Sequence, residues 1–171
     1  MTATDVTGNL LNIAEISVAF AGFAALVSVL RQRGTRADAL HDILRLRIVI
    51  STSMVVVVAS LIPIGLASFH LSERLVWGCS AATLLVFNYG VIHSFIKSYK
   101  PVEGRFPPDN FAVGIVAVLE FVDQAALILI LFNFWPALNY PLYLAALIVN
   151  ISQAAFVFLR FVASEFSAKE V

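Results

Sequence analysis

Residues 48–69 read IVISTSMVVVVASLIPIGLASF, a run without a single charged side chain. The hydrocarbon core of a bilayer is about 30 Å thick and a helix rises about 1.5 Å per residue, so about 20 apolar residues cross it. The four valines at 55–58 would favour a strand in water, but a lone span in lipid must satisfy its own backbone hydrogen bonds. The run therefore predicts a membrane-spanning helix. Within it, Pro63 cannot donate to the carbonyl of Ala59, which predicts a bend.

The whole chain resembles this run in composition. It has 171 residues, of which 60% are hydrophobic and 13% charged, and its mean hydropathy is +0.92. A soluble domain is roughly 45–50% apolar and about 25% charged, so the composition excludes a water-exposed globular domain. The 11 basic and 11 acidic residues cancel, which excludes a basic nucleic-acid-binding arm. The single cysteine, Cys79, excludes a disulfide scaffold.

Five stretches of the chain are long and apolar enough to span a bilayer. The predicted helices cover residues 10–30, 36–69, 75–97, 111–135 and 141–163. The second has an extension at the cytoplasmic boundary, where Thr35 and Asp38 have the spacing of a capping box. None alternates apolar and polar residues as a membrane β-barrel would. The expected fold is an all-α integral membrane protein with a single domain over residues 1–171, a five-transmembrane-helix bundle of one N-terminal helix plus two helical hairpins.

The basic residues predict the orientation of this bundle. Ten of the 11 lie in residues 31–47, 97–105 and 160–169, which five spans place on one side, and only Arg74 lies on the other. By the positive-inside rule, the N-terminus is outside and the C-terminus is cytoplasmic. An aromatic belt is expected at the outer boundary, formed by Trp77, Trp135, Tyr140 and Tyr143. The short loops are typical of a multi-pass protein of the bacterial inner membrane.

Polar side chains near the centre of the predicted spans are the strongest indication of function. An ionisable group at that depth costs at least about 2.5–3.5 kcal/mol to insert, so it faces protein or water. A rise of about 1.5 Å per residue places polar groups of the third, fourth and fifth spans in one layer. The predicted ion- or proton-binding residues are Glu120, Asp123, Gln124, Asn150, Gln153 and Asn88.

Two carboxylates one helical turn apart, Glu120 and Asp123, cannot both stay ionised in a low dielectric without a cation between them. This arrangement predicts a proton or cation site, and the leading expectation is a small oligomeric channel or transporter for a cation or proton. The competing interpretation is a protonated carboxyl that hydrogen-bonds Asn150 or Gln153 as interhelical glue. The protein would then be a non-catalytic subunit that packs against and stabilises a larger membrane complex.

The first span carries a stripe of small residues, with Glu15 beside it. Small side chains allow helices to approach closely, and they can also line a narrow pore. In the pore interpretation Glu15 would form an acidic ring at the outer pore mouth. The residues expected in the helix contact are Ala14, Ser17, Ala21, Gly22, Ala24 and Ser28.

Other chemistries lack the residues they need. His41, His70 and His93 lie at different predicted depths, which opposes a haem or a histidine-based metal site. The chain has no glycine-rich phosphate loop, nucleophile elbow or zinc-protease helix. The sequence thus predicts no enzyme, no cofactor and no metal. The expected partners are the lipid bilayer, further copies of the chain in a homo-oligomer, or a larger membrane protein, and no nucleic acid.

Overall fold

A computed structural model describes residues 3–30, 36–100, 104, 107 and 109–167. Within those residues the chain is helical and has no strand, which confirms the predicted all-helical class. The elements are α1 (Ala3–Leu30), α2 (Arg36–Ala67), α3 (Glu73–Tyr99), α4 (Asn110–Leu131), the short 3₁₀ helix η1 (Pro136–Leu138) and α5 (Asn139–Ser167). Each of the five α-helices contains a segment long and apolar enough to cross a membrane.

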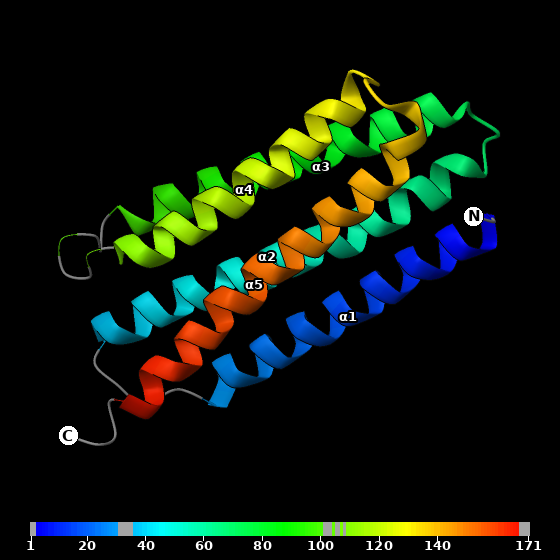
Figure 1. The fold of residues 1–171 in the computed structure, drawn as a ribbon. Helices are drawn as coiled ribbons and strands as arrows, with labels where there is room; N and C mark the ends of the chain where they lie inside the picture. Colours follow the sequence, from blue (N-terminus) through cyan, green and yellow to red (C-terminus); the bar gives the residue numbers. More distant parts are fainter. Residues whose placement is uncertain (1–2, 31–35, 101–103, 105–106, 108, 168–171) are drawn as a thin grey trace.

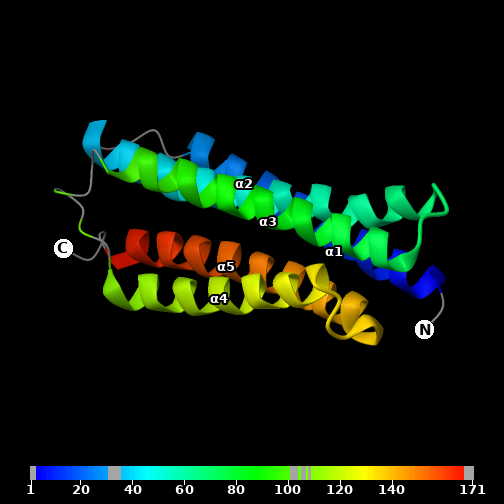
Figure 2. The same ribbon diagram turned by 90° about the horizontal axis from the view of Figure 1, so that it is seen from above.

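The five long helices run side by side, with α2 and α5 between α1 on one side and α3 and α4 on the other (Figure 1). Turned by 90°, α2 and α3 form one layer and α4 and α5 form a second (Figure 2). α1 packs mainly on α2 and touches α5, whereas α4 packs on α5 and α3. This arrangement brings α3, α4 and α5 together along one side of the bundle.

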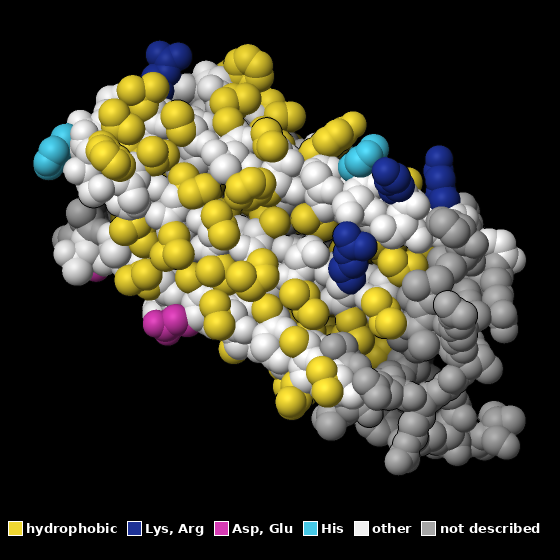
Figure 3. All heavy atoms as spheres, turned by 180° about the vertical axis from the view of Figure 1, so that it is seen from behind, with side chains coloured by type: hydrophobic (Ala, Val, Ile, Leu, Met, Phe, Trp, Pro, Cys, Tyr) yellow, Lys and Arg dark blue, Asp and Glu magenta, His cyan; other side chains and the backbone are white. Residues whose placement is uncertain are grey.

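The interior of the bundle is apolar along most of its length. One cluster of buried side chains includes Leu10, Leu84, Leu127 and Leu147, and a second surrounds Ala24 between α1, α2 and α5. Large apolar side chains also remain exposed on all five helices, as expected for surfaces that face lipid. On the face shown in Figure 3, apolar side chains cover the middle, and most of the Lys and Arg side chains lie toward one end.

Some helices begin or end at residues other than the predicted ones, and local polar groups fix several of these ends. α1 starts at Ala3 rather than residue 10, with Asp5 in its first turn, where a carboxylate favours the positive end of the helix dipole. α2 starts at Arg36, the predicted residue, and ends at Ala67 rather than 69. Of the predicted capping box, Thr35 and the side chain of Asp38 lie outside the described residues.

α4 ends at Leu131 and not at residue 135, because Asn133 adopts the left-handed conformation with φ 54°. The backbone N–H of Asn133 donates to Ile130 O at 2.9 Å, and that of Phe134 donates to Leu129 O at 3.1 Å. These are the two bonds of a Schellman motif, which closes the last carbonyls of a helix, and Asn tolerates its left-handed position.

The start of α4 is fixed by its N-cap. The Asp109 carboxylate accepts the backbone N–H of Phe111 at 2.9 Å and of Ala112 at 3.4 Å. The same carboxylate accepts a hydrogen bond from the Arg160 guanidinium of α5. Donation by Arg160 is the main reason that the pKa of Asp109 is lowered from its ordinary value, and the Phe111 N–H adds to it. This ion pair ties the first turn of α4 to the far end of α5.

Candidate functional site

The Asp123 carboxyl lies at the centre of a hydrogen-bond network between three helices. Its side chain is 0% exposed. Oδ2 accepts from Asn88 Nδ2 of α3 at 2.7 Å, and Oδ1 accepts from Asn150 Nδ2 of α5 at 3.0 Å. Asn150 Nδ2 also donates to the carbonyl of Ala146 at 3.0 Å, within its own helix. A single carboxyl on α4 thus joins α3 to α5.

Glu120 forms a second, separate set of hydrogen bonds one helical turn closer to the start of α4. Its Oε1 accepts from Gln124 Nε2 at 2.8 Å, and its Oε2 accepts from Gln153 Nε2 of α5 at 3.3 Å. Gln153 is buried, whereas Glu120 is half-buried. Glu120 is therefore the more accessible of the two carboxyls on α4.

The structure brings together all six polar residues that the sequence selected for an ion or proton site. We call this set the polar layer: Asn88, Glu120, Asp123, Gln124, Asn150 and Gln153. It pairs Asp123 with Asn150 and Glu120 with Gln153, so α4 and α5 face each other through matched polar groups.

Both carboxyls of the polar layer are held by neutral amides. In the part of the chain that the structure describes, no Lys or Arg forms an ion pair with Asp123 or Glu120. Burial of an ionised carboxylate without a cation is costly, because amide donors replace only part of its hydration. A proton on the carboxyl, or a small cation beside it, removes that cost. The polar layer therefore has the chemical groups that the predicted proton or cation site requires.

Tyr143 is a buried polar contact that the sequence interpretation missed. The sequence predicts it in the aromatic belt, but its side chain is 0% exposed, and its hydroxyl donates to the carbonyl of Ala59 on α2 at 2.8 Å. This is the carbonyl that Pro63 leaves without a helical donor. The unpaired carbonyl was visible in the sequence, and a search for a donor on the other spans could have selected Tyr143.

The small-residue stripe of α1 lies inside the chain. Ala14, Ser17, Ala21 and Ala24 are buried, and the Ser17 hydroxyl donates to the carbonyl of Ile13 in its own helix at 2.8 Å. Ala24 packs in a cluster with side chains of α2 and α5. The stripe is thus a contact within one chain, and it lines no pore there.

Two residues expected on or beside this stripe stand apart from it, and a third cannot be placed. Gly22 is exposed, and a Cβ added there would meet no atom within 4 Å, so it is not part of the buried face. Glu15 is also exposed, on the outside of α1 rather than toward the bundle interior. The side chain of Ser28 lies outside the described residues. A helix of 3.6 residues per turn separates Gly22 from Ala21 by about 100°, which explains their different environments.

The histidines and acidic residues do not form a metal centre in the described ranges. His70 and His93 are both exposed, and no group of three or more His, Cys, Asp or Glu side chains there could hold a metal ion. The side chain of His41 lies outside those ranges. Cys79, the only cysteine, is free and exposed.

Comparisons with protein-family models, with curated proteins and with solved structures found no match for this chain. Its function is therefore inferred from the polar layer itself. The property to be explained is a fully buried carboxyl, contributed by α4, that accepts one amide from α3 and one from α5.

Proposed function

We propose that this protein is a small channel or transporter that carries a proton or a small cation across the bacterial inner membrane. In this proposal the chain inserts as one N-terminal helix plus two hairpins, with its N-terminus outside and its C-terminus in the cytoplasm. The observation that carries the proposal is the buried Asp123 carboxyl, which has only amide partners among the described residues. Because five helices enclose little volume, several copies of the chain would form the conducting assembly.

The two carboxyls have complementary positions for such transfer. Glu120 is half-buried, whereas Asp123 is enclosed one helical turn farther along α4. A proton or cation would reach Glu120 first and Asp123 second. The amides of Gln124, Gln153, Asn88 and Asn150 would stabilise the carboxylates during exchange, because each donates to one of the four carboxyl oxygens.

The test is flux through purified protein in liposomes, followed with a pH-sensitive dye and with cation-sensitive dyes. Asp123→Asn and Glu120→Gln keep the side-chain size and remove the carboxyl, so at least one should abolish flux or its pH dependence. Glu73→Gln is the matched control, since it removes an exposed carboxyl at the start of α3. Wild-type flux in both polar-layer variants would refute transport through these carboxyls.

A second candidate is a non-catalytic subunit that stabilises a larger membrane complex. The observation that favours it is that both Asp123 oxygens already accept a hydrogen bond while the side chain is 0% exposed. Such a closed network is typical of interhelical hydrogen bonds that hold a bundle together. Under this proposal wild-type liposomes show no flux, and the chain co-purifies in stoichiometric amount with a larger membrane protein after mild solubilisation.

A further inference from the structure

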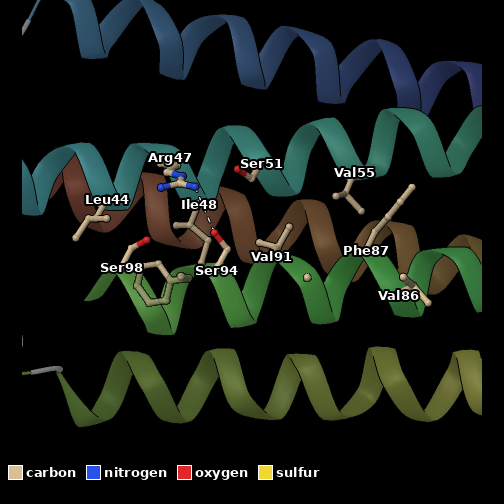
Figure 4. Close-up of a pocket in the computed structure, with 12 residues that line it drawn as sticks. Leu44, Arg47, Ile48, Ser51, Val55, Val86, Phe87, Val91, Ser94 and Ser98 are labelled. Carbon is tan, nitrogen blue, oxygen red and sulfur yellow. Dashed lines mark hydrogen bonds between the residues drawn. The ribbon is translucent and has the colours of Figure 1, made fainter. Parts of the chain in front are cut away.

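A groove of about 450 Å³ runs between α2 and α3, lined by no residue of the polar layer (Figure 4). Its α2 wall extends from Leu44 to Val55, and its α3 wall extends from Val86 to Ser98. We call it the α2–α3 groove. With about 1.5 Å of rise per residue, each wall is about 16–18 Å long, close to half of the hydrocarbon thickness of about 30 Å. The groove thus has the length of one lipid leaflet.

The two ends of the α2–α3 groove differ in chemistry. At one end the exposed Arg47 guanidinium reaches from α2 toward α3, and its Nη2 donates to Ser94 Oγ at 3.3 Å (Figure 4). Ser98 lies one turn beyond Ser94 in the same wall. The other end is formed by apolar side chains, among them Val55 and Phe87. No carboxylate lines the groove, so the charge of Arg47 is not neutralised by any lining residue.

Gly90 keeps the middle of the groove open. It lines the groove on α3, and a Cβ built on it would meet no atom within 4 Å. A larger side chain at this position would therefore occupy the groove and leave the helix packing unchanged. The result is a cationic and hydroxyl-bearing end joined to an apolar channel of leaflet length.

We propose that the α2–α3 groove binds one anionic phospholipid, with its phosphate at Arg47 and Ser94 and an acyl chain along Val55, Phe87 and Gly90. Charge complementarity selects this occupant, because a guanidinium with a neighbouring hydroxyl matches the oxygens of a phosphate. A neutral apolar partner helix would leave Arg47 without an anion. The inference rests on the membrane insertion in the proposed function, and it is independent of transport.

Native mass spectrometry of the full chain, released from nanodiscs with equal phosphatidylglycerol and phosphatidylcholine, tests the headgroup. We expect one retained lipid per chain, with about fivefold preference for phosphatidylglycerol, which is the factor that one basic side chain near an anionic lipid provides. Arg47→Gln should remove this preference. Arg74→Gln is the matched control and should keep it, since Arg74 lies at the start of α3, at the opposite end of the helix from Ser94 and Ser98. No preference in the wild type, or an unchanged preference in Arg47→Gln, would overturn the proposal.

A second pair of variants tests the acyl-chain channel. Gly90→Leu should reduce the retained lipid several-fold, because the leucine side chain fills the groove. Gly22→Leu makes the same change at an exposed position of α1 that also has no atom near an added Cβ, and it should retain lipid as the wild type does. Equal lipid retention by both variants would contradict the proposed channel.

The same samples separate this inference from transport. Asp123→Asn should keep the lipid preference even where it abolishes flux, since Asp123 does not line the groove. Loss of the preference in Asp123→Asn as well as in Arg47→Gln would contradict the assignment to the groove, while loss of flux alone would not affect it.

Discussion

α1 and α4 are attached to the rest of the bundle by opposite chemistry. α1 presents small buried residues such as Ala14, Ser17 and Ala24, which allow close contact with α2 and α5. α4 presents the Asp123 carboxyl, which accepts amides from α3 and α5. In the most apolar stretch of α4 only 22% of the residues are buried, compared with 33% in α1. α4 thus combines a smaller buried share with a buried carboxyl that is hydrogen-bonded to two other helices.

In the proposed membrane setting, this comparison concerns how helices associate in a solvent that is itself apolar. Lipid tails are as apolar as leucine, so contact between leucine-like surfaces gives little driving force. Two alternatives remain, namely dispersion contacts between closely packed small residues and hydrogen bonds between polar groups. In this protein α1 relies mainly on the first, with one hydrogen bond from Asn9 Nδ2 to the Tyr140 hydroxyl at 2.9 Å, and α4 adds the second to the apolar contacts of Leu127 and Ile130. Each can be broken separately.

The largest effect is expected from Asp123→Leu. It leaves the Asn88 and Asn150 amides without their buried acceptor, and each unsatisfied donor costs about 1–3 kcal/mol. We expect the free energy of unfolding, measured by SDS titration of mixed micelles, to fall by about 2–4 kcal/mol. Phe121→Leu is the control, because Phe121 is 75% exposed on the same helix. A loss no larger than that of the control would show that the polar layer does not hold α4.

The stability of the contact between α1 and its neighbours should depend on the size of the buried side chains rather than on their polarity. Ala24 is 0% exposed, so Ala24→Leu forces extra carbon atoms into a filled contact between α1, α2 and α5. We expect the free energy of unfolding in the same assay to fall by about 1–3 kcal/mol. Gly22→Leu, two residues away on the exposed side, should change stability by less than about 0.5 kcal/mol. If the two variants are equally destabilised, Ala24 does not lie in the contact of α1 with α2 and α5.

A smaller effect should come from Tyr143→Phe, which removes the donor to the Ala59 carbonyl. The expected loss is about 1 kcal/mol, as for one hydrogen bond. In a Pro63→Ala background the backbone N–H at position 63 can serve the same carbonyl, so the loss should be less than half as large. A double-mutant cycle of unfolding free energies measures this difference. An identical loss in both backgrounds would disprove the link between Pro63 and Tyr143.

The smallest effect concerns the second attachment of α4, the ion pair between Asp109 and Arg160. Since its partner lowers the pKa of Asp109 from 3.8, the folded state is favoured while the carboxylate is ionised. This contribution is present above pH 3.8 and is lost as the pH falls through the lower folded-state value. Asp109→Asn should therefore reduce the thermal midpoint slightly at pH 7, and more in low salt than in high salt. A difference that persists unchanged at pH 2 would contradict this explanation.

The sequence was sufficient for the number of helices and for the meeting of Asp123 with Asn150. Length and charge spacing define a span, and a constant rise per residue gives the depth of each polar group. The same rule placed Asn88 in the layer. Depth alone does not give the rotation of a helix about its axis, so it did not separate the buried Ala21 from the exposed Gly22.

Features that depend on local backbone geometry, or on two helices together, could not be predicted from the sequence. The end of α4 depends on Asn133 adopting a left-handed conformation, which a residue type permits but does not require. The α2–α3 groove needs two walls on different helices, one from Leu44 to Val55 and one from Val86 to Ser98. No single segment carries a signal for it.

The placement of the two Asp123 partners has a consequence for biosynthesis. Asn88 precedes Asp123 by 35 residues and Asn150 follows it by 27. A ribosome that delivers the helices in order therefore offers α4 one amide first, and the second only after α5 has been translated. Until then one oxygen of Asp123 lacks its amide partner. The last helix thus completes the hydrogen bonds of an earlier one, and a chain truncated before α5 would lack the Asn150 amide that Asp123 accepts.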